Sequence, residues 1–264
     1  MSRLPVGECD LMLITLDALR LDVAVEAMAA GRTPFLAGLF GGWEPRHSPA
    51  SFTYAAHAAY FAGFWPTPIS PGPHPRPFAL RFAGSRSIDR DTCVLDGDNI
   101  VSGLRQRGYH TVCIGGVGFF NQRNPLGSVF PSLFEKSVWR PAFSVTEPHS
   151  TRNQVECAVT LIRDTPITQP LFLFMNVSAL HPPTHHYVRG AGVDSIETQS
   201  AALEYVDREL PPLFAAMYER DRGGTAHLMS DHGTLFGDDG YRGHRVGHPT
   251  VWTVPYAEHH WTPH

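Results

Sequence analysis

The stretch DLMLITLD, residues 10–17, decides the fold. No charged residue interrupts the run between its two aspartates, and such a continuous apolar run is typical of a central strand buried on both faces. The carboxylate of Asp17 comes directly after that strand, where burial is costly unless the group accepts hydrogen bonds or binds a metal. Asp17 is therefore either a metal ligand or a cap of the helix that follows.

Further strand and helix patterns alternate along the chain. Strands are predicted at 109–115, 170–177 and 225–230, and helices at 22–30, 53–62, 150–164 and 194–221, with a break near Pro211 and Pro212. A last short strand is expected at 250–254 and a proline-rich surface loop at 65–90. This alternation predicts one α/β domain over 1–264, with a doubly wound, mostly parallel sheet and helices on both faces. Ligands of such sheets bind beyond the carboxyl ends of the strands.

Composition narrows the choice of partners and location. The chain has 264 residues and a formal net charge of -4, which offers no long-range attraction to nucleic acid or to an anionic membrane. No apolar run is long enough to span a membrane, and the first ten residues do not resemble a signal peptide. We therefore expect no nucleic-acid or membrane partner and a cytoplasmic location. The oligomeric state stays open.

The segment TYAAHAAYFA, residues 53–62, predicts a helix that begins at Thr53. The backbone N–H groups and the dipole at a helix N-terminus favour a bound oxyanion. The hydroxyl of Thr53 is therefore either an N-cap or a nucleophile beside an anion site. His57 lies one turn further on the same face, where it either faces the site or packs in the core.

The segment MSDHGTLFGDDGYRGHRVGH, residues 229–248, places Asp231 and His232 at the end of an apolar strand. His244 and His248 follow within the same segment. Carboxylate and imidazole groups together suit Zn, Mn or Mg, so a metal site is predicted here. The alternative is a polar loop with a solvated acidic pair at 238–239. His181, after another apolar strand, lies at the same predicted sheet edge.

Taken together, these segments resemble the alkaline phosphatase superfamily, and within it the sulfatase-like branch. The strand ending in Asp17 is similar to the family's first metal-ligand motif, and the helix from Thr53 is similar to its nucleophile helix. The resemblance covers nearly the whole chain in order. Its further matches are Arg20 and Asp22 behind Asp17; His57, Ala62, Gly63 and Pro66 after Thr53; His181, Pro182 and Pro183; Ser230, Asp231, His232 and Gly233; and His244, at the spacing of a site histidine in phosphoethanolamine transferases.

Departures from the family pattern restrict the chemistry. Sulfatases oxidise a Cys or Ser nucleophile to formylglycine, and a Pro and an Arg follow it two and four residues later. Here the positions hold Thr53, Ala55 and His57, so formylglycine cannot form and phosphoryl chemistry is implied. Two-metal members place further ligands where this chain has Asn176 and His181, which gives a second metal little support.

The resemblance implies a metal-dependent hydrolase or transferase of a phosphoryl-type ester. Its substrate would be a small-molecule or peptide-linked phosphoester, and its cofactor a divalent ion, Zn or Mn, with Mg or Ca as alternatives. The implied residues are Thr53, His181 and His244 for catalysis; Asp17, Thr53, Asp231 and His232 for the metal; and Arg20, Asp22, His57 and His248 in support. The alternative is a non-catalytic metal- or phosphate-binding accessory protein of a biosynthetic or peptide-modifying system.

Overall fold

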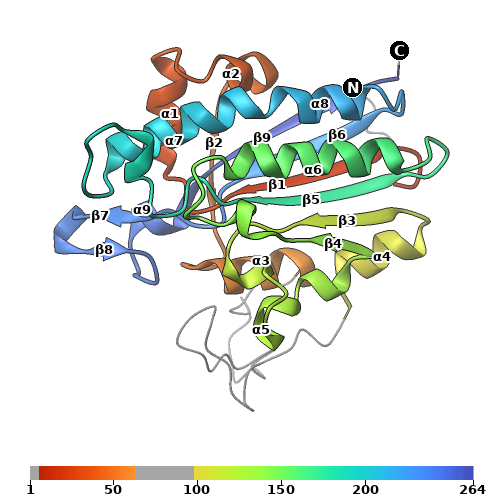
Figure 1. Cartoon of the computed structure of the whole chain (residues 1–264), viewed down its shortest axis with the longest axis horizontal. Coiled ribbons are helices and arrows are strands. Elements are labelled where there is room, and N and C mark those ends of the chain that lie inside the picture. Colours follow the sequence, from red (N-terminus) through yellow and green to blue (C-terminus); the bar gives the residue numbers. More distant parts are fainter. Residues whose placement is uncertain (1–5, 64–97, 264) are drawn as a thin grey trace, which may run out of the picture.

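A seven-stranded mixed sheet forms the centre of the computed structural model, which describes residues 6–63 and 98–263 (Figure 1). The predicted loop 65–90, with Pro66, lies outside the described residues. The strand order is β2-β9-β6-β1-β5-β3-β4. The strands are β1 (Asp10–Leu16), β2 (Glu44–His47), β3 (His110–Ile114), β4 (Lys136–Val138), β5 (Leu171–Val177), β6 (Gly224–Met229) and β9 (Thr253–Trp261).

The five strands β6, β1, β5, β3 and β4 run parallel, while β9 pairs antiparallel with both β6 and β2. The stretch that decides the fold is the central strand β1, which lies between β5 and β6. A short antiparallel hairpin of β7 (Leu235–Phe236) and β8 (Arg242–Gly243) projects beyond the sheet. These pairings confirm the predicted mostly parallel α/β sheet.

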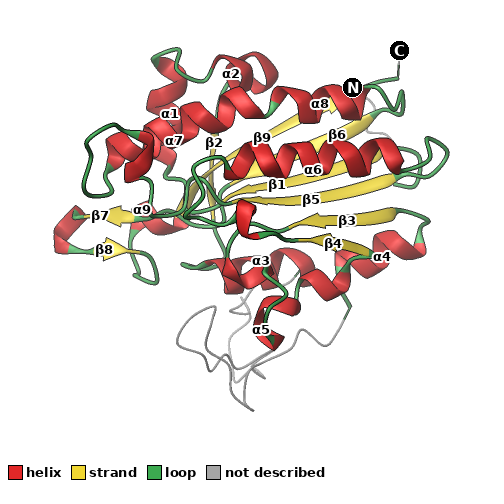
Figure 2. Cartoon of the chain, viewed as in Figure 1, coloured by secondary structure: helices red, strands yellow, loops and turns green. Residues whose placement is uncertain are grey.

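Helices cover both faces of the sheet, as Figure 2 shows. One face packs against α1 (Leu21–Ala29), α2 (Pro34–Phe40), α6 (Ser150–Asp164), α7 (Ile196–Glu209) and α8 (Pro211–Tyr218). The other packs against α3 (Thr53–Ala62), α4 (Ile100–Gln106) and α5 (Pro125–Ser128). Successive β5 side chains serve the two cores in turn: Leu173 and Met175 join the first, Phe172 and Phe174 the second.

The helix pattern predicted at 194–221 is broken where expected. Helix α7 ends at Glu209, and α8 begins at Pro211, because a proline inside a helix lacks the N–H that the previous turn needs. The predicted start at Asp194 is two residues early, since Ser195 caps α7 by accepting a hydrogen bond from the Thr198 N–H.

The short strand predicted at 250–254 is wrong in its bounds. Residues Pro249–Trp252 form the single helical turn α9, and the strand β9 runs from Thr253 to Trp261. Pro249 favours the first turn of a helix, which removes the preceding residues from the strand. In the described part of the chain, no helix combines the length and apolarity that crossing a membrane requires.

Candidate metal centre and active site

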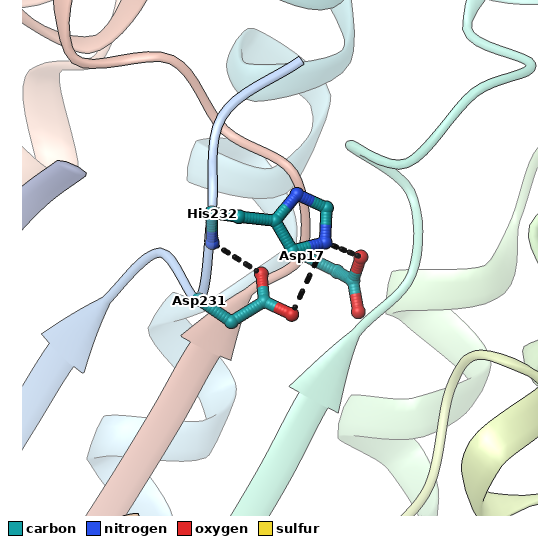
Figure 3. Close-up of side chains that lie close together, drawn as sticks. All are labelled: Asp17, Asp231 and His232. Atoms are coloured by element: carbon teal, nitrogen blue, oxygen red, sulfur yellow. Dashed lines mark hydrogen bonds and ion pairs between the residues drawn. The ribbon is translucent and has the colours of Figure 1, made fainter. Parts of the chain in front are cut away.

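Two neighbouring parallel strands bring three polar side chains together at their carboxyl ends (Figure 3). Asp17 directly follows β1, and Asp231 and His232 lie two and three residues after Met229, the last residue of β6. All three side chains are fully buried. The Nε2 atom of His232 lies 3.9 Å from Asp17 Oδ1 and 3.6 Å from Asp231 Oδ2. The predicted convergence of these residues at one sheet edge is therefore present.

The unsatisfied atoms of this cluster point toward one another. Nδ1 of His232 donates to the Gly233 carbonyl at 2.9 Å, so the neutral ring turns the lone pair of Nε2 toward the two carboxylates. Asp17 Oδ1 and Asp231 Oδ2 are buried and have no hydrogen-bond partner. Two orphaned carboxylate oxygens and one imidazole lone pair, all within 4.8 Å, fit the donor set of a divalent metal ion.

Burial sets the electrostatics of the cluster. It raises the pKa of Asp17 well above its usual value, and the neighbouring charge of Asp231 adds to the effect. It also raises the pKa of Asp231 and lowers that of His232 to about 3. Two buried carboxylates that repel each other are costly without a cation, which would favour their charged forms. A bound cation would therefore stabilise the charged forms of both carboxylates.

Thr53 faces this cluster and does not cap its helix. The N-cap of α3 is Phe52, and no side chain accepts a hydrogen bond there. Thr53 is buried, with 2% of its surface exposed, and its hydroxyl oxygen lies 3.2 Å from His232 Nε2. The structure therefore contradicts the interpretation of this hydroxyl as a helix cap. The hydroxyl lies beside the cluster, at the N-terminus of a ten-residue helix.

His57 is a buried support for Thr53. Its Nδ1 donates to the Thr53 carbonyl at 2.7 Å, so its Nε2 accepts from the Thr15 hydroxyl at 3.1 Å. The ring also packs edge-on against Phe120 and Phe174. Burial lowers its pKa, which keeps the ring neutral. His57 therefore packs in the core, and its ring also fixes the first turn of α3.

Asn176, a polar residue near the end of β5, holds the end of β1 and the Asp17 side chain in place. Its side-chain NH₂ donates to Asp17 Oδ2 at 2.9 Å and to the Thr15 hydroxyl at 3.2 Å. Its carbonyl Oδ1 accepts from the backbone N–H of Val117 at 2.9 Å. Sequence patterns did not predict that Asn176 positions Asp17. The signal that could have shown it is a single amide in the otherwise apolar run PLFLFMNV. With its NH₂ turned to Asp17, this amide does not present an oxygen to a second metal there.

Gly233, which follows Asp231 and His232, lies where only a glycine fits. A Cβ atom on Gly233 would lie 2.0 Å from the Thr250 carbonyl oxygen, so a side chain cannot fit. The close approach lets Gly233 donate to the Val251 carbonyl at 2.8 Å and seats the metal-site loop against α9. Ser48 ties the segment before α3 to the same loop by donating to the Asp231 carbonyl.

His181 and His244 lie beside the cluster. The ring of His244 is 4.5 Å from that of His232 and 5.5 Å from that of His181, measured between centroids. Nδ1 of His181 donates to the Pro182 carbonyl at 2.7 Å, so its Nε2 donates only when the ring is protonated. Burial lowers the pKa of His181 and brings that of His244 to about 2.

The predicted supporting residues fall into two groups. The guanidinium of Arg20 pairs with Asp22 at 2.7 Å and with Asp238 at 2.8 Å, which joins the start of α1 to the β7–β8 hairpin that precedes His244. His248 lies elsewhere: it caps α9 by accepting from the Thr250 N–H and meets Asp239 at 3.1 Å. The structure therefore gives His248 a capping role and does not bring it into the cluster.

A cavity of about 1050 Å³ opens beside the cluster. Thr53, His181 and His244 line it, together with a wall from the loop after β3, including Gly116 and Val117. Sequence patterns did not identify the lining residues Arg123, Trp139 and Arg245. The cavity is much larger than a phosphoryl group requires, and its volume is at the upper end of the range for pockets that hold whole small-molecule ligands.

Comparison with known proteins relies on the structure alone. No family model matches the chain, and no curated protein is similar to it in sequence. Solved structures do match: one is a protein in the alkaline phosphatase superfamily from Vibrio parahaemolyticus, with a TM-score of 0.59 and 17% identity over 95% of this chain and 60% of that one. The chain thus has the fold of the alkaline phosphatase superfamily, as its motifs predict.

Two periplasmic domains named EptC have similar folds. The C-terminal periplasmic domain of the phosphoethanolamine transferase EptC from Campylobacter jejuni has a TM-score of 0.63 and 14% identity, covering 96% of this chain and 79% of that one. The corresponding domain of EptC from Escherichia coli, in complex with Zn, has a TM-score of 0.61 and 15% identity over 97% and 73%.

Proposed function

We propose that this chain is a metal-dependent hydrolase or transferase of a phosphoester, with the Thr53 hydroxyl as nucleophile. The observation that carries the proposal is the position of that hydroxyl, 3.2 Å from His232 Nε2 and beside the orphaned oxygens of Asp17 and Asp231. The superfamily fold and the phosphotransferase domains that share it support phosphoester chemistry.

A divalent cation held by Asp17, Asp231 and His232 would lower the pKa of a neighbouring hydroxyl and offset negative charge on a phosphoryl oxygen. Zn or Mn fits the two carboxylates and one imidazole, with Mg or Ca as alternatives. The Zn complex of the E. coli domain is consistent with Zn.

Thr53 Oγ1 loses its proton and forms a bond to phosphorus while the bond from phosphorus to the leaving oxygen breaks, and the leaving oxygen takes up a proton. Water or an acceptor alcohol then attacks the phosphothreonine, and the threonine oxygen leaves and regains its proton. Backbone N–H groups in the first turn of α3 stabilise negative charge on the transferring group. A neighbouring phosphoryl dianion would favour the protonated ring of His181, whose Nε2–H then donates to an oxygen of the transferring group.

Substitution of Thr53 tests the proposal. Thr53→Ala is expected to lower turnover of phosphomonoester and phosphodiester model substrates by a factor on the order of 10⁴ or more while leaving metal content nearly unchanged. Thr53→Ser retains the hydroxyl and should keep measurable turnover. Thr33→Ala is the matched control, because Thr33 is an equally buried threonine before a helix on the opposite sheet face. Full turnover in Thr53→Ala would show that the nucleophile is wrongly assigned.

The same assays address the alternative of a non-catalytic binding protein. That alternative predicts metal uptake and phosphate binding without turnover of any model substrate in the unaltered chain. A cytoplasmic location stays a prediction of the sequence, although both transferase domains compared above are periplasmic.

A further inference from the structure

The cavity beside Thr53 extends well beyond the atoms that the chemistry needs. Its volume of about 1050 Å³ leaves most of the space for a group other than the transferred phosphoryl. The composition of its lining therefore carries information about that group.

Charge in the lining has one sign. Among the described residues, the cavity is lined by the guanidinium-bearing residues Arg123 and Arg245 and by no aspartate or glutamate. The whole chain carries a net charge of -4, so a one-sided cationic lining is not a reflection of overall composition. Charges of one sign inside a cleft raise the local concentration of oppositely charged ligands.

The Arg123 side chain is held in a fixed place. Its Cζ lies 4.5 Å from the centre of the Trp139 ring, and the indole N–H of Trp139 donates to the Gly116 carbonyl at 2.8 Å. A stacked guanidinium keeps its in-plane N–H donors available for an anion. No described carboxylate forms an ion pair with Arg123.

Contacts with the segment before α3 hold Arg245. Its backbone N–H donates to the Ser51 carbonyl at 2.8 Å, which fixes it to the segment just before Thr53, and its Cζ lies 5.7 Å from the Phe52 ring. The lining also has uncharged, apolar parts, which include Trp139, Val117 and Phe119.

We infer that the substrate carries a second anionic group, a phosphate or a carboxylate, joined to the transferred phosphoryl by an uncharged linking body. The body packs on Trp139, and Arg123 binds the distal anion, with Arg245 adding to the positive field. The inference rests on the proposed function only for the placement of the phosphoryl group at Thr53.

Three alkyl phosphates of matched length test the inference on the metal-loaded protein. Butyl phosphate has a neutral tail, 1,4-butanediol bisphosphate has a distal phosphate, and 4-phosphonooxybutanoate has a distal carboxylate. We expect kcat/KM to favour at least one anionic-tail substrate by about tenfold over butyl phosphate, after correction for the two equivalent ends of the bisphosphate. Preference for both identifies a general anion site, and preference for the bisphosphate alone identifies a phosphate site.

Arg123→Gln should bring this ratio down to about one. Arg140→Gln is a stringent control, because Arg140 stands between the lining residues Trp139 and Pro141 but does not line the cavity. Equal loss of the ratio in both variants, or an unchanged ratio in Arg123→Gln, would overturn the assignment.

Binding to the Thr53→Ala protein separates this inference from the chemistry. Calorimetric titration should show the same preference for the anionic tails without turnover, and the preference should vanish in Thr53→Ala/Arg123→Gln. If the unaltered protein turns over none of the three compounds while this binding preference holds, the proposed reaction fails and the distal anion site stands. Equal binding of all three compounds refutes the site.

Discussion

Metal ions should stabilise this protein in a manner that depends steeply on pH. Asp17 and Asp231 are fully buried, and both pKa values are raised in the metal-free protein. Because each folded-state pKa lies above the unfolded value near 3.8, the protonated carboxyls favour folding at pH values below about 4. This contribution is lost as the pH rises through the raised folded-state pKa values. A cation replaces the displaced protons, so its effect should grow as the pH rises.

The size of the effect follows from linkage. A ligand that binds only the folded state, at a hundred times its Kd, adds about 2.7 kcal/mol, which corresponds to roughly 5–10 °C in Tm for a chain of this size. Each displaced proton changes the apparent affinity about tenfold per pH unit. His232, with a pKa of about 3, is already neutral at the pH values of the assay and does not compete.

Differential scanning fluorimetry of chelator-treated protein, with and without Zn or Mn at pH 5.5, 6.5 and 7.5, measures this shift. The matched variant Asp231→Asn should raise the Tm of the metal-free protein, since it removes one of two repelling buried charges, and should abolish the metal-induced shift. A shift that does not change with pH, or one that persists in Asp231→Asn, would refute the assignment of this cluster as a metal site.

Three further predictions concern the surroundings of the site. Arg20→Ala should destabilise the protein by about 2–4 kcal/mol in urea unfolding, because it leaves Asp238 without its partner, and a change below about 0.5 kcal/mol would contradict this. The pKa of Asp238 is lowered to about 2, chiefly by Arg20, so stability from this pair should be present above pH 4 and lost between about pH 4 and 2; the acid unfolding curve of Asp238→Asn should lack that step. Gly116→Ala should impair folding or metal affinity, since the new Cβ would lie 2.2 Å from the Asn176 carbonyl oxygen, and a variant with unaltered Tm and metal affinity would show that this contact relaxes at no cost.

Sequence patterns predicted the elements that end at the site because those elements have strong signals. β1 and β5 are nearly continuous apolar runs, while β6 includes Thr225 and His227 among its apolar residues. Placing Asp17 and Asp231 at one edge of the sheet requires only the rule that parallel strands share a carboxyl edge. Thr53 was placed by its helix start. Whether the Thr53 hydroxyl faces the ligands or caps the helix depends on the rotation of α3, which is set by tertiary contacts such as that of His57.

Other parts could not be predicted, for identifiable reasons. β9 contains Pro255 and a mixture of half-exposed histidines, so it shows neither alternation nor an apolar run. β4 has three residues and is too short for a periodic signal. The cavity wall, from Gly116 to Arg123 and on to Trp139, is built of single turns and loops. Its residues come together only through non-local contacts such as the one from Trp139 to Gly116.

The separation of the cluster along the chain has a consequence for assembly. Ala18, next to Asp17, donates to Asp231 across 213 residues of sequence, so the cluster has no local precursor in the unfolded chain. A cation cannot nucleate folding here, since its ligands meet only when β1 and β6 have already docked, and closing so long a loop is slow. Metal capture would then be a late step of maturation, and its kinetics in refolding experiments would report when the sheet closes.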